Sequence, residues 1–277
     1  TKAILGDEMY EHFQGGEFWN DKPEPIKNNK PLDFALECAL RGETEKAYQI
    51  LKEEEKQKPD CDRVKFNLGW HEMERGNLLK GHRLMAQGRN EGVFGSPQQN
   101  VIAPLWNGER DCTVFMKMEG GFGDQIHGIR YAKNIAEYGN KVIVSGCEEL
   151  TDMFKDLEGV TVFGSHEMAP NIYHDYWYPN MSITIPLELE WSDVSGKPYI
   201  KRDGESEGKI GLKWSGNPEF EHEQHRLFPT ELMWKVFKGF EDKCISLQKE
   251  GDSPDWMNHV TLDTWEETRK EISKCDL

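Results

Sequence analysis

The residues with the clearest chemical potential in this chain are Gly120, Gly121 and Gly123, which form a turn that runs into the carboxylate of Asp124. Apolar residues at 113–118 predict a buried β-strand before the turn, and the pattern after it predicts a helix that opens on Asp124. Such a turn gathers backbone N–H groups and a helix N-terminus at the carboxyl edge of a parallel sheet, where ligands commonly bind. A carboxylate at that point can act as a general base.

Two generic phosphate-binding motifs are excluded at this turn. A dinucleotide fingerprint needs a third glycine where this chain has Ile126, and the chain contains no GxxxxGK[ST] loop. A glycine-rich connection without any ligand therefore stays open. Three roles are open for Asp124: a catalytic base, a helix N-cap, or a hydrogen-bond acceptor that orients a substrate. The helix N-terminus favours the charged form of this carboxylate.

Composition narrows the class of protein. The net charge of -16 argues against nonspecific binding of nucleic acid or of an anionic membrane. The sequence shows no apolar run long enough to span a membrane and no signal-peptide pattern at its start. The 6 cysteines are scattered without a CxxC pair, which predicts neither a metal cluster nor a disulfide framework and favours the cytoplasm.

The first third of the chain predicts a leader at 1–31 and helices at 32–96. Three pairs of residues keep a spacing of 34 within the helical part, which is typical of tetratricopeptide repeats: Gly42 with Gly76, Ala47 with Gly81, and Leu51 with Met85. The match is degenerate, so an ordinary helical hairpin is the alternative. Two such units are too few for an independent solenoid, and we expect them to pack on the segment that follows.

The remaining sequence alternates strand and helix patterns and predicts an α/β fold with parallel sheets. Pro104 and Trp106 are expected to anchor a linker at 97–110. We expect a first Rossmann-like domain at 97–200, a hinge at 196–207 and a second domain at 208–277. The expected strands are 113–118, 141–145, 160–164, 209–214 and 243–248; the expected helices are 124–138, 147–157, 229–239 and 264–274; residues 174–182 are expected to be irregular and to line a cleft or a domain seam.

Four segments in this order carry a resemblance to a known family: PLWNGE, EGGFGDQIHGIRYA, IGLKWSGNPEFEHEQHRLFP and ISLQKE. Together with the repeats before them, they resemble bacterial and phage proteins that join tetratricopeptide repeats to a heptosyltransferase-like glycosyltransferase module. The resemblance covers roughly residues 33 to 277. It implies a GT-B architecture, in which two Rossmann-like domains face each other across a cleft, with the acceptor on the first and the nucleotide sugar on the second. It also implies an inverting reaction without a metal ion or further cofactor.

The resemblance assigns the general base to Asp124, a phosphate contact to Arg226 and the donor-side turn to Ser215, Gly216 and Asn217. Lys213 is a second cation for the diphosphate, or simply an outward-facing strand residue. For Arg226 the alternative is an ion pair with a neighbouring glutamate. The candidate acceptor-binding residues are Gly121, Gly123, Gln125, His127, Arg130, Tyr176 and Trp177. For His127 the alternative is a partly buried structural histidine, and for the two aromatic residues it is core packing.

The chain departs from the family at its end. The family continues past a strand like SKCDL into a loop that holds much of the nucleotide, whereas this sequence ends at Leu277 and begins without methionine, which predicts a fragment with an incomplete donor domain. His222 and His225 lack the spacing of a zinc helix and a third ligand, so no metal is expected.

Two functions therefore compete at the level of sequence. One is a sugar transferase whose partners are a nucleotide sugar and a glycan or protein acceptor. The other is a non-catalytic scaffold that binds a protein through the helical repeats. A Rossmann-type epimerase is disfavoured by the missing third glycine and the absence of a YxxxK pair.

Overall fold

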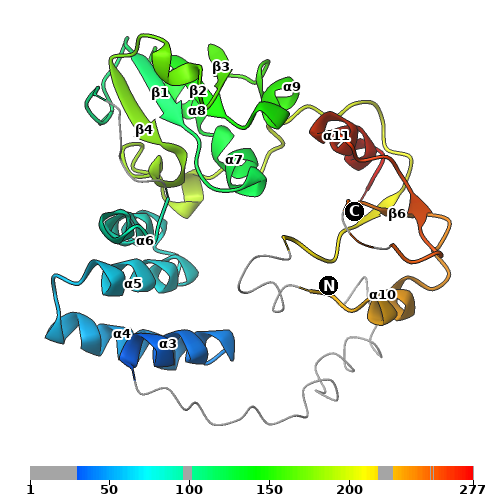
Figure 1. The fold of residues 1–277 in the computed structure, drawn as a ribbon, viewed down its shortest axis with the longest axis horizontal. Coiled ribbons are helices and arrows are strands. Elements are labelled where there is room, and N and C mark those ends of the chain that lie inside the picture. The colour runs from blue at the N-terminus through cyan, green and yellow to red at the C-terminus, as the bar shows by residue number, and fades with distance from the viewer. Residues whose placement is uncertain (1–29, 96–101, 218–226, 250, 252, 277) are drawn as a thin grey trace. The chain divides into compact units, whose positions relative to one another are not determined.

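The computed structural model describes residues 30–95, 102–217, 227–249, 251 and 253–276 (Figure 1). The chain divides into two compact units, one formed by Ile26–Lys201 and the other containing Arg202–Leu277. Each unit holds a parallel β-sheet together with helices, so the α/β fold predicted from the sequence is confirmed at that level.

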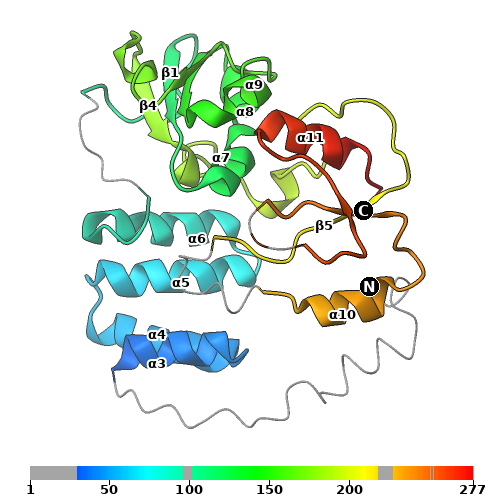
Figure 2. The same cartoon turned by 45° about the vertical axis from the view of Figure 1, so that its right-hand side comes forward.

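The larger unit begins with helices that stack side by side (Figure 2). They are α3 (Pro31–Leu40), α4 (Thr44–Gln57), α5 (Asp62–Glu74) and α6 (Leu78–Met85), followed by the 3-10 helix η2 (Ala86–Glu91). Gly42 after α3 and Gly76 after α5 both adopt left-handed backbone angles, with φ of 77° and 88°. Residues with a side chain rarely adopt this conformation, so the glycines 34 positions apart in the sequence mark equivalent turns of successive helical hairpins.

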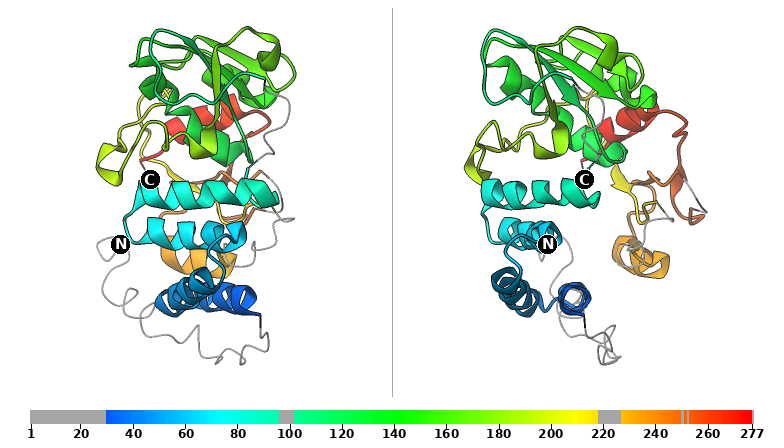
Figure 3. Two further views of the ribbon diagram at one scale, coloured as in Figure 1. Left: turned by 90° about the vertical axis from the view of Figure 1, so that its left-hand side faces the viewer. Right: turned by 60° about the vertical axis from the view of Figure 1, so that its left-hand side comes forward.

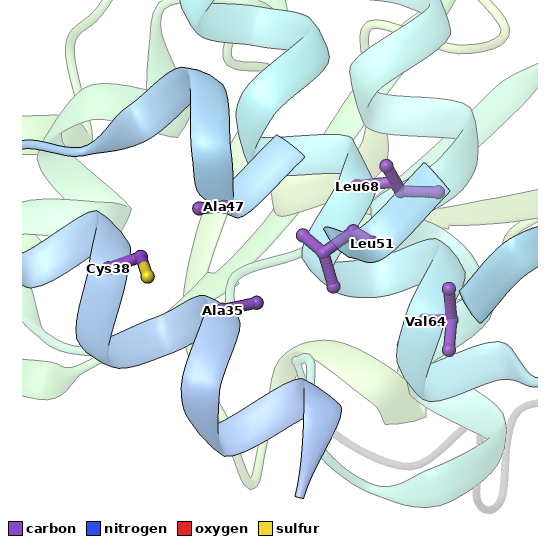
Figure 4. Close-up of a cluster of buried hydrophobic side chains, with 6 residues drawn as sticks. All are labelled: Ala35, Cys38, Ala47, Leu51, Val64 and Leu68. Carbon is purple, nitrogen blue, oxygen red and sulfur yellow. The ribbon is translucent and has the colours of Figure 1, made fainter. Parts of the chain in front are cut away.

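The helices are held together by a small apolar cluster (Figure 4). Its buried members are Ala35, Cys38, Ala47, Leu51, Val64 and Leu68. Between α5 and α6 the packing is closer still, because a Cβ atom added to Gly81 would lie 2.8 Å from the carbonyl oxygen of Gly69. Alanine in place of Gly81 would therefore not fit there without a shift of the backbone.

The second half of the same unit is a sheet with helices, at the other end of the unit from the helical layers (Figure 3). The strands are β1 (Thr113–Lys117), β2 (Lys141–Gly146), β3 (Val162–Ser165) and β4 (Tyr176–Pro179), in the order β3-β2-β1-β4. All neighbouring strands are parallel, so their carboxyl ends meet at one edge. The linker before the sheet is anchored as expected, because Trp106 is fully buried and its indole N–H donates to the carbonyl oxygen of Glu109 at 2.9 Å.

Several predicted boundaries in this half are wrong. The helix expected at 124–138 is two helices, α7 (Phe122–Ile129) and α8 (Ala132–Ala136), and it begins at Phe122 rather than Asp124. The helix expected at 147–157 is reduced to η3 (Glu148–Leu150) and α9 (Thr151–Phe154). Within 174–182, which was expected to be irregular, β4 pairs with β1 and is followed by the 3-10 helix η5 (Asn180–Ser182).

The smaller unit has a parallel sheet in the order β5-β6-β7. Its elements are β5 (Ile210–Leu212), α10 (Thr230–Phe237), β6 (Cys244–Ser246), β7 (Asn258–His259) and α11 (Trp265–Ser273). Trp214, Met233, Cys244 and Met257 form its buried core. The short strand β7 was missed, whereas Cys275 in the final segment does pair with Lys209 as an isolated parallel bridge.

In the part of the chain that the structure describes, no helix is both long and apolar enough to cross a membrane.

Candidate functional site

The glycine turn after β1 has a geometry that only its glycines allow. Gly120 has φ of 75°, and a Cβ atom there would collide with the carboxylate of Asp124. That carboxylate lies close because its Oδ2 accepts a hydrogen bond from the N–H of Gly121 at 2.9 Å. Asp124 is the third residue of α7, so it is not the N-cap, which is Gly121. Its carboxylate instead accepts the N–H of that N-cap residue, the role of the third residue in a capping box.

Capping uses only one of the two oxygens of Asp124. The residue is exposed, and Oδ1 accepts no hydrogen bond from any residue that the structure describes. The carboxylate is therefore fixed in orientation by Oδ2 and presents Oδ1 at the carboxyl edge of the sheet. Such an arrangement can serve both as a helix cap and as a base.

Behind the turn lies a buried ion pair that the sequence did not reveal. Glu119 receives two hydrogen bonds from the guanidinium of Arg89, each 2.8 Å long, and the side chains are only 1% and 6% exposed. Arg89 also donates to the hydroxyl oxygen of Ser182 at 2.9 Å. Because Arg89 belongs to η2, the helical segment contributes directly to the base of the glycine turn.

Asn180 completes this support from the end of β4. Its side chain is buried; Oδ1 accepts from the N–H of Glu119 at 2.8 Å, and Nδ2 donates to the carbonyl oxygen of Asp124 at 3.2 Å. Gly128 makes the contact possible, because a Cβ atom on Gly128 would collide with the amide of Asn180. The turn is therefore held on both sides by buried polar groups.

Gln125, a candidate acceptor-binding residue, is 1% exposed and faces the protein. Its Oε1 accepts from the N–H of Cys147 at 3.0 Å, and its Nε2 donates to the carbonyl oxygen of Gly120 at 3.3 Å and to Sγ of Cys147 at 3.0 Å. With its amide occupied in this way, Gln125 supports the site rather than contacting an acceptor.

His127 is exposed on α7, and Arg130 is the partly exposed residue that directly follows this helix. Burial of part of its ring, together with the charge of Arg130, lowers the pKa of His127, although the charge of Asp124 acts the other way. His127 is therefore largely neutral at pH 7 and does not neutralise Asp124. The Arg130 guanidinium lies over the ring of Tyr199, 4.8 Å from its centre, and hydrogen-bonds the carbonyl oxygen of Ser195.

The two aromatic candidates are placed away from the turn. Tyr176 pairs with Val114 near the start of β1, so it lies at the amino edge of the sheet, beside an open hollow of about 640 Å³ that is also lined by Arg110 and Asp175. Trp177 is 4% exposed and packs with Phe115 in the core. A buried ring offers a sugar no face to stack on, so Trp177 is not placed to bind an acceptor. Tyr176 lies at the edge of the sheet opposite to Asp124, so it is not placed to bind an acceptor beside that carboxylate.

On the smaller unit, Lys213 is exposed directly after β5. The N–H groups of Trp214 and Ser215 both donate to Oε1 of the buried Gln248, at 3.3 and 3.1 Å. The Ser215 N–H is therefore used within the protein and does not face a phosphate, contrary to expectation. Gly216 and Asn217 continue the turn, whereas Arg226, His222 and His225 lie outside the described residues.

Among the described residues, no group of three or more His, Cys, Asp or Glu side chains has the arrangement of a metal site. Comparisons of the chain with models of known families, with curated proteins and with solved structures each find no match.

The supporting residues that sequence reasoning missed share one property. Arg89, Glu119 and Asn180 are polar, and none forms a local motif with the glycine turn. Arg89 is 30 positions from Glu119, and Asn180 is 61 positions from it. Only their place in the sequence could have indicated their role. Glu119 and Asn180 directly follow buried segments, and the carboxyl ends of such segments meet at one edge of a parallel sheet.

Proposed function

We propose that this chain is a sugar transferase module of the GT-B type, with tetratricopeptide-like helices attached to its acceptor domain. The observation that supports it most is the carboxylate of Asp124, which is exposed at the carboxyl edge of a parallel sheet and oriented through one oxygen while the other accepts no described hydrogen bond. Ligands of open α/β sheets bind at this edge.

In the proposed reaction the hydroxyl oxygen of the acceptor attacks the anomeric carbon of a nucleotide sugar. The bond between that carbon and the diphosphate oxygen breaks, and the acceptor proton passes to Asp124. The configuration at the anomeric carbon is inverted. Lys213 and Arg226 would balance the negative charge of the departing diphosphate. We assign the reaction to the cytoplasm, where nucleotide sugars are available.

The proposal is tested by a thermal-shift panel of nucleoside diphosphates. A ligand that binds only the folded state raises the free energy of unfolding, by about 2.7 kcal/mol at one hundred times its Kd. At least one nucleotide should raise the melting temperature by several degrees. Lys213→Ala should reduce this shift, whereas Lys238→Ala, which removes another exposed lysine of the same unit, should not.

A panel in which no nucleotide shifts the melting temperature would remove the transferase proposal. The second candidate, a non-catalytic scaffold that binds a protein through the helices, would then be favoured. It is supported by apolar side chains that α3 and α5 leave in solvent: Leu36 is 48% exposed, Leu40 39% and Trp70 51%. Leu36 and Leu40 are four residues apart and lie on one face of α3.

A further inference from the structure

Two chemically active side chains at the carboxyl edge of the larger sheet have no part in the proposed transfer. Gly146 at the end of β2 pairs with Ser165 at the end of β3, so the next residues, Cys147 and His166, emerge side by side from neighbouring strands. Sγ of Cys147 lies 3.8 Å from Nε2 of His166, within hydrogen-bond range for sulfur. The two form a thiol–imidazole pair drawn from two strands.

A third group faces the same sulfur. Because Oε1 of Gln125 accepts the N–H of Cys147 at 3.0 Å, the amide orientation is fixed and Nε2 faces Sγ at 3.0 Å. Gln125 is 1% exposed and has no access to water as an alternative partner. An N–H group directed at sulfur stabilises negative charge on it. The absence of a side chain at Gly146 allows the Gln125 amide to lie close, since a Cβ atom on Gly146 would be 3.1 Å from Oε1 of Gln125.

The histidine is in the state that accepts a proton. Burial of part of its ring, followed by the charge of Lys117, lowers the pKa of His166, so the imidazole is largely neutral at pH 7. Solvent still reaches the pair, because His166 is exposed and Cys147 is only half-buried. A small reagent can therefore approach the sulfur.

The other cysteines have different surroundings, although all 6 are free thiols. Cys38 and Cys244 are buried. Cys112 lies beside the carbonyl oxygen of Glu109, and Cys275 beside that of Glu271, at 3.8 and 3.5 Å. Oxygen acceptors stabilise the protonated thiol, and burial raises the pKa of both Cys112 and Cys275. Cys61, which is half-buried, is the natural reference thiol.

We propose that Cys147 is a reactive thiol and a site of oxidation by hydrogen peroxide, with His166 as its base. His166 removes the thiol proton, and the sulfur attacks one oxygen of the peroxide. The O–O bond breaks, a sulfur–oxygen bond forms, and the departing hydroxide takes the proton from His166 to become water. The sulfur is oxidised by two electrons to a sulfenic acid, and the peroxide is reduced. Because Gln125 also holds Gly120, the new oxygen competes for the amide that supports the glycine turn.

The test measures labelling rates of each cysteine by peptide mass spectrometry, in the folded full chain. One series uses iodoacetamide, and a second uses hydrogen peroxide with dimedone to trap sulfenic acid. Cys147 should react about tenfold or more faster than Cys61, Cys112 and Cys275 in both series. His166→Gln should slow Cys147 about tenfold and leave Cys61 unchanged. His259→Gln, at an exposed histidine of the smaller unit, should change neither rate.

The proposal is overturned if Cys147 reacts no faster than Cys61, or if its rate is the same in the His166→Gln variant. Because these readouts need no nucleotide sugar, they do not depend on the proposed transferase activity.

Discussion

At the scale of single residues, the position of Asp124 is compatible with a structural role and with the proposed catalytic one. Its Oδ2 accepts the N–H of the N-cap residue Gly121, which is the role of the third residue in a capping box. Because Asp124 is exposed, its Oδ1 is accessible to the hydroxyl group of a sugar acceptor. Capping and catalysis are therefore compatible here, and the cap supplies the orientation that a base requires.

Two glycines of α7 provide a matched pair for testing how the turn is supported. A Cβ atom on Gly128 would collide with the buried amide of Asn180, whereas one on Gly123 meets nothing within 4 Å. Gly128→Ala should lower the free energy of unfolding by about 1–3 kcal/mol through overpacking. Gly123→Ala should leave it unchanged or raise it by up to about 1 kcal/mol, because alanine favours helices. Urea denaturation measures both, and equal effects would contradict the assigned contact.

His82 in α6 predicts a dependence of stability on pH. Its Nδ1 is buried without a hydrogen-bond partner among the described residues. Burial lowers the pKa of His82 from 6.5, the backbone of Met181 acts in the opposite direction, and the charge of His127 lowers it further. The unfolded chain therefore binds a proton more readily than the folded one, so stability is full above about pH 6.5 and falls as the pH decreases below it.

The measurement is the melting temperature between about pH 7.5 and pH 5. His127 and His166 also have lowered pKa values and add to the decline. His82→Gln should therefore make the dependence shallower without abolishing it. A variant with the same slope as the original chain would show that His82 is not a source of the effect.

At the scale of elements, the ion pair between Arg89 and Glu119 links the helical segment to the turn. Removing one partner of a buried pair leaves an uncompensated charge, so Glu119→Gln should cost about 3–5 kcal/mol of unfolding free energy. Replacing both residues by methionine should cost much less than the sum of the two single replacements, as a double-mutant cycle in urea would show.

The chain contains a control for this cycle. Arg83 and Glu188 join the same two parts of the larger unit at 3.7 Å, but their side chains are 54% and 77% exposed. Arg83→Met should change the unfolding free energy by less than about 1 kcal/mol. If it costs as much as Glu119→Gln, burial does not explain the strength of the Arg89 pair.

The sequence predicted the elements that local patterns specify and missed those set by distant contacts. Periodicity located β1 and β2 closely, and the paired glycines located the helical turns. Residues 174–182 contain Pro179 and clustered aromatics and show no clear alternation, so β4 is defined by pairing with β1 rather than by its own pattern. The helix at 124–138 was extended too far because its apolar stripe continues through the break between α7 and α8.

Contacts between residues that are distant in the sequence also limited the prediction of the candidate site. The glycine turn and Asp124 form a local motif, so the sequence could single them out, whereas Asn180 and Arg89 reach the base of the turn only through the tertiary fold. The sequence predicted that Trp177 binds a ligand, because a cluster of aromatic residues can equally be a buried core strand or a surface on which sugar rings stack.

At the scale of the whole molecule, the division between the two units falls between Lys201 and Arg202. This point lies within the polar, glycine-containing segment 196–207 that the sequence marked as a hinge. Lys197 and Lys201 are both exposed there, and the segment lies outside any helix or strand. The smaller unit holds its own end of the segment through Arg202, which donates to the carbonyl oxygens of Ser273 and Cys275 at 2.8 and 2.9 Å.

Among the lysines and arginines that the structure describes, limited trypsin digestion should therefore cut first after Lys201, because proteases act at exposed connections with little local structure. The bond after Lys197 is followed by Pro198, and trypsin does not cleave it. Mass spectrometry of the early products should show a fragment that begins at Arg202 and contains α11. Early cleavage within α3 to α6 would instead indicate that the helical hairpins open before the connection between the units.

The central claim is that Asp124 removes a proton from a sugar acceptor. Its most direct test is release of nucleoside diphosphate from a nucleotide sugar, measured with a panel of glycan acceptors for the original chain and two variants. Asp124→Asn keeps an oxygen that can accept the Gly121 N–H but removes the base. Asp193→Asn makes the same change at a cap of the same geometry, where Oδ2 accepts the N–H of Glu190 at 2.9 Å.

Asp124→Asn should reduce turnover at least about 100-fold, the usual contribution of a general base, with the melting temperature and the nucleotide shift unchanged. Asp193→Asn should keep full turnover. Sustained turnover by the Asp124→Asn variant would contradict the account, because it would leave Asp124 as a helix cap alone.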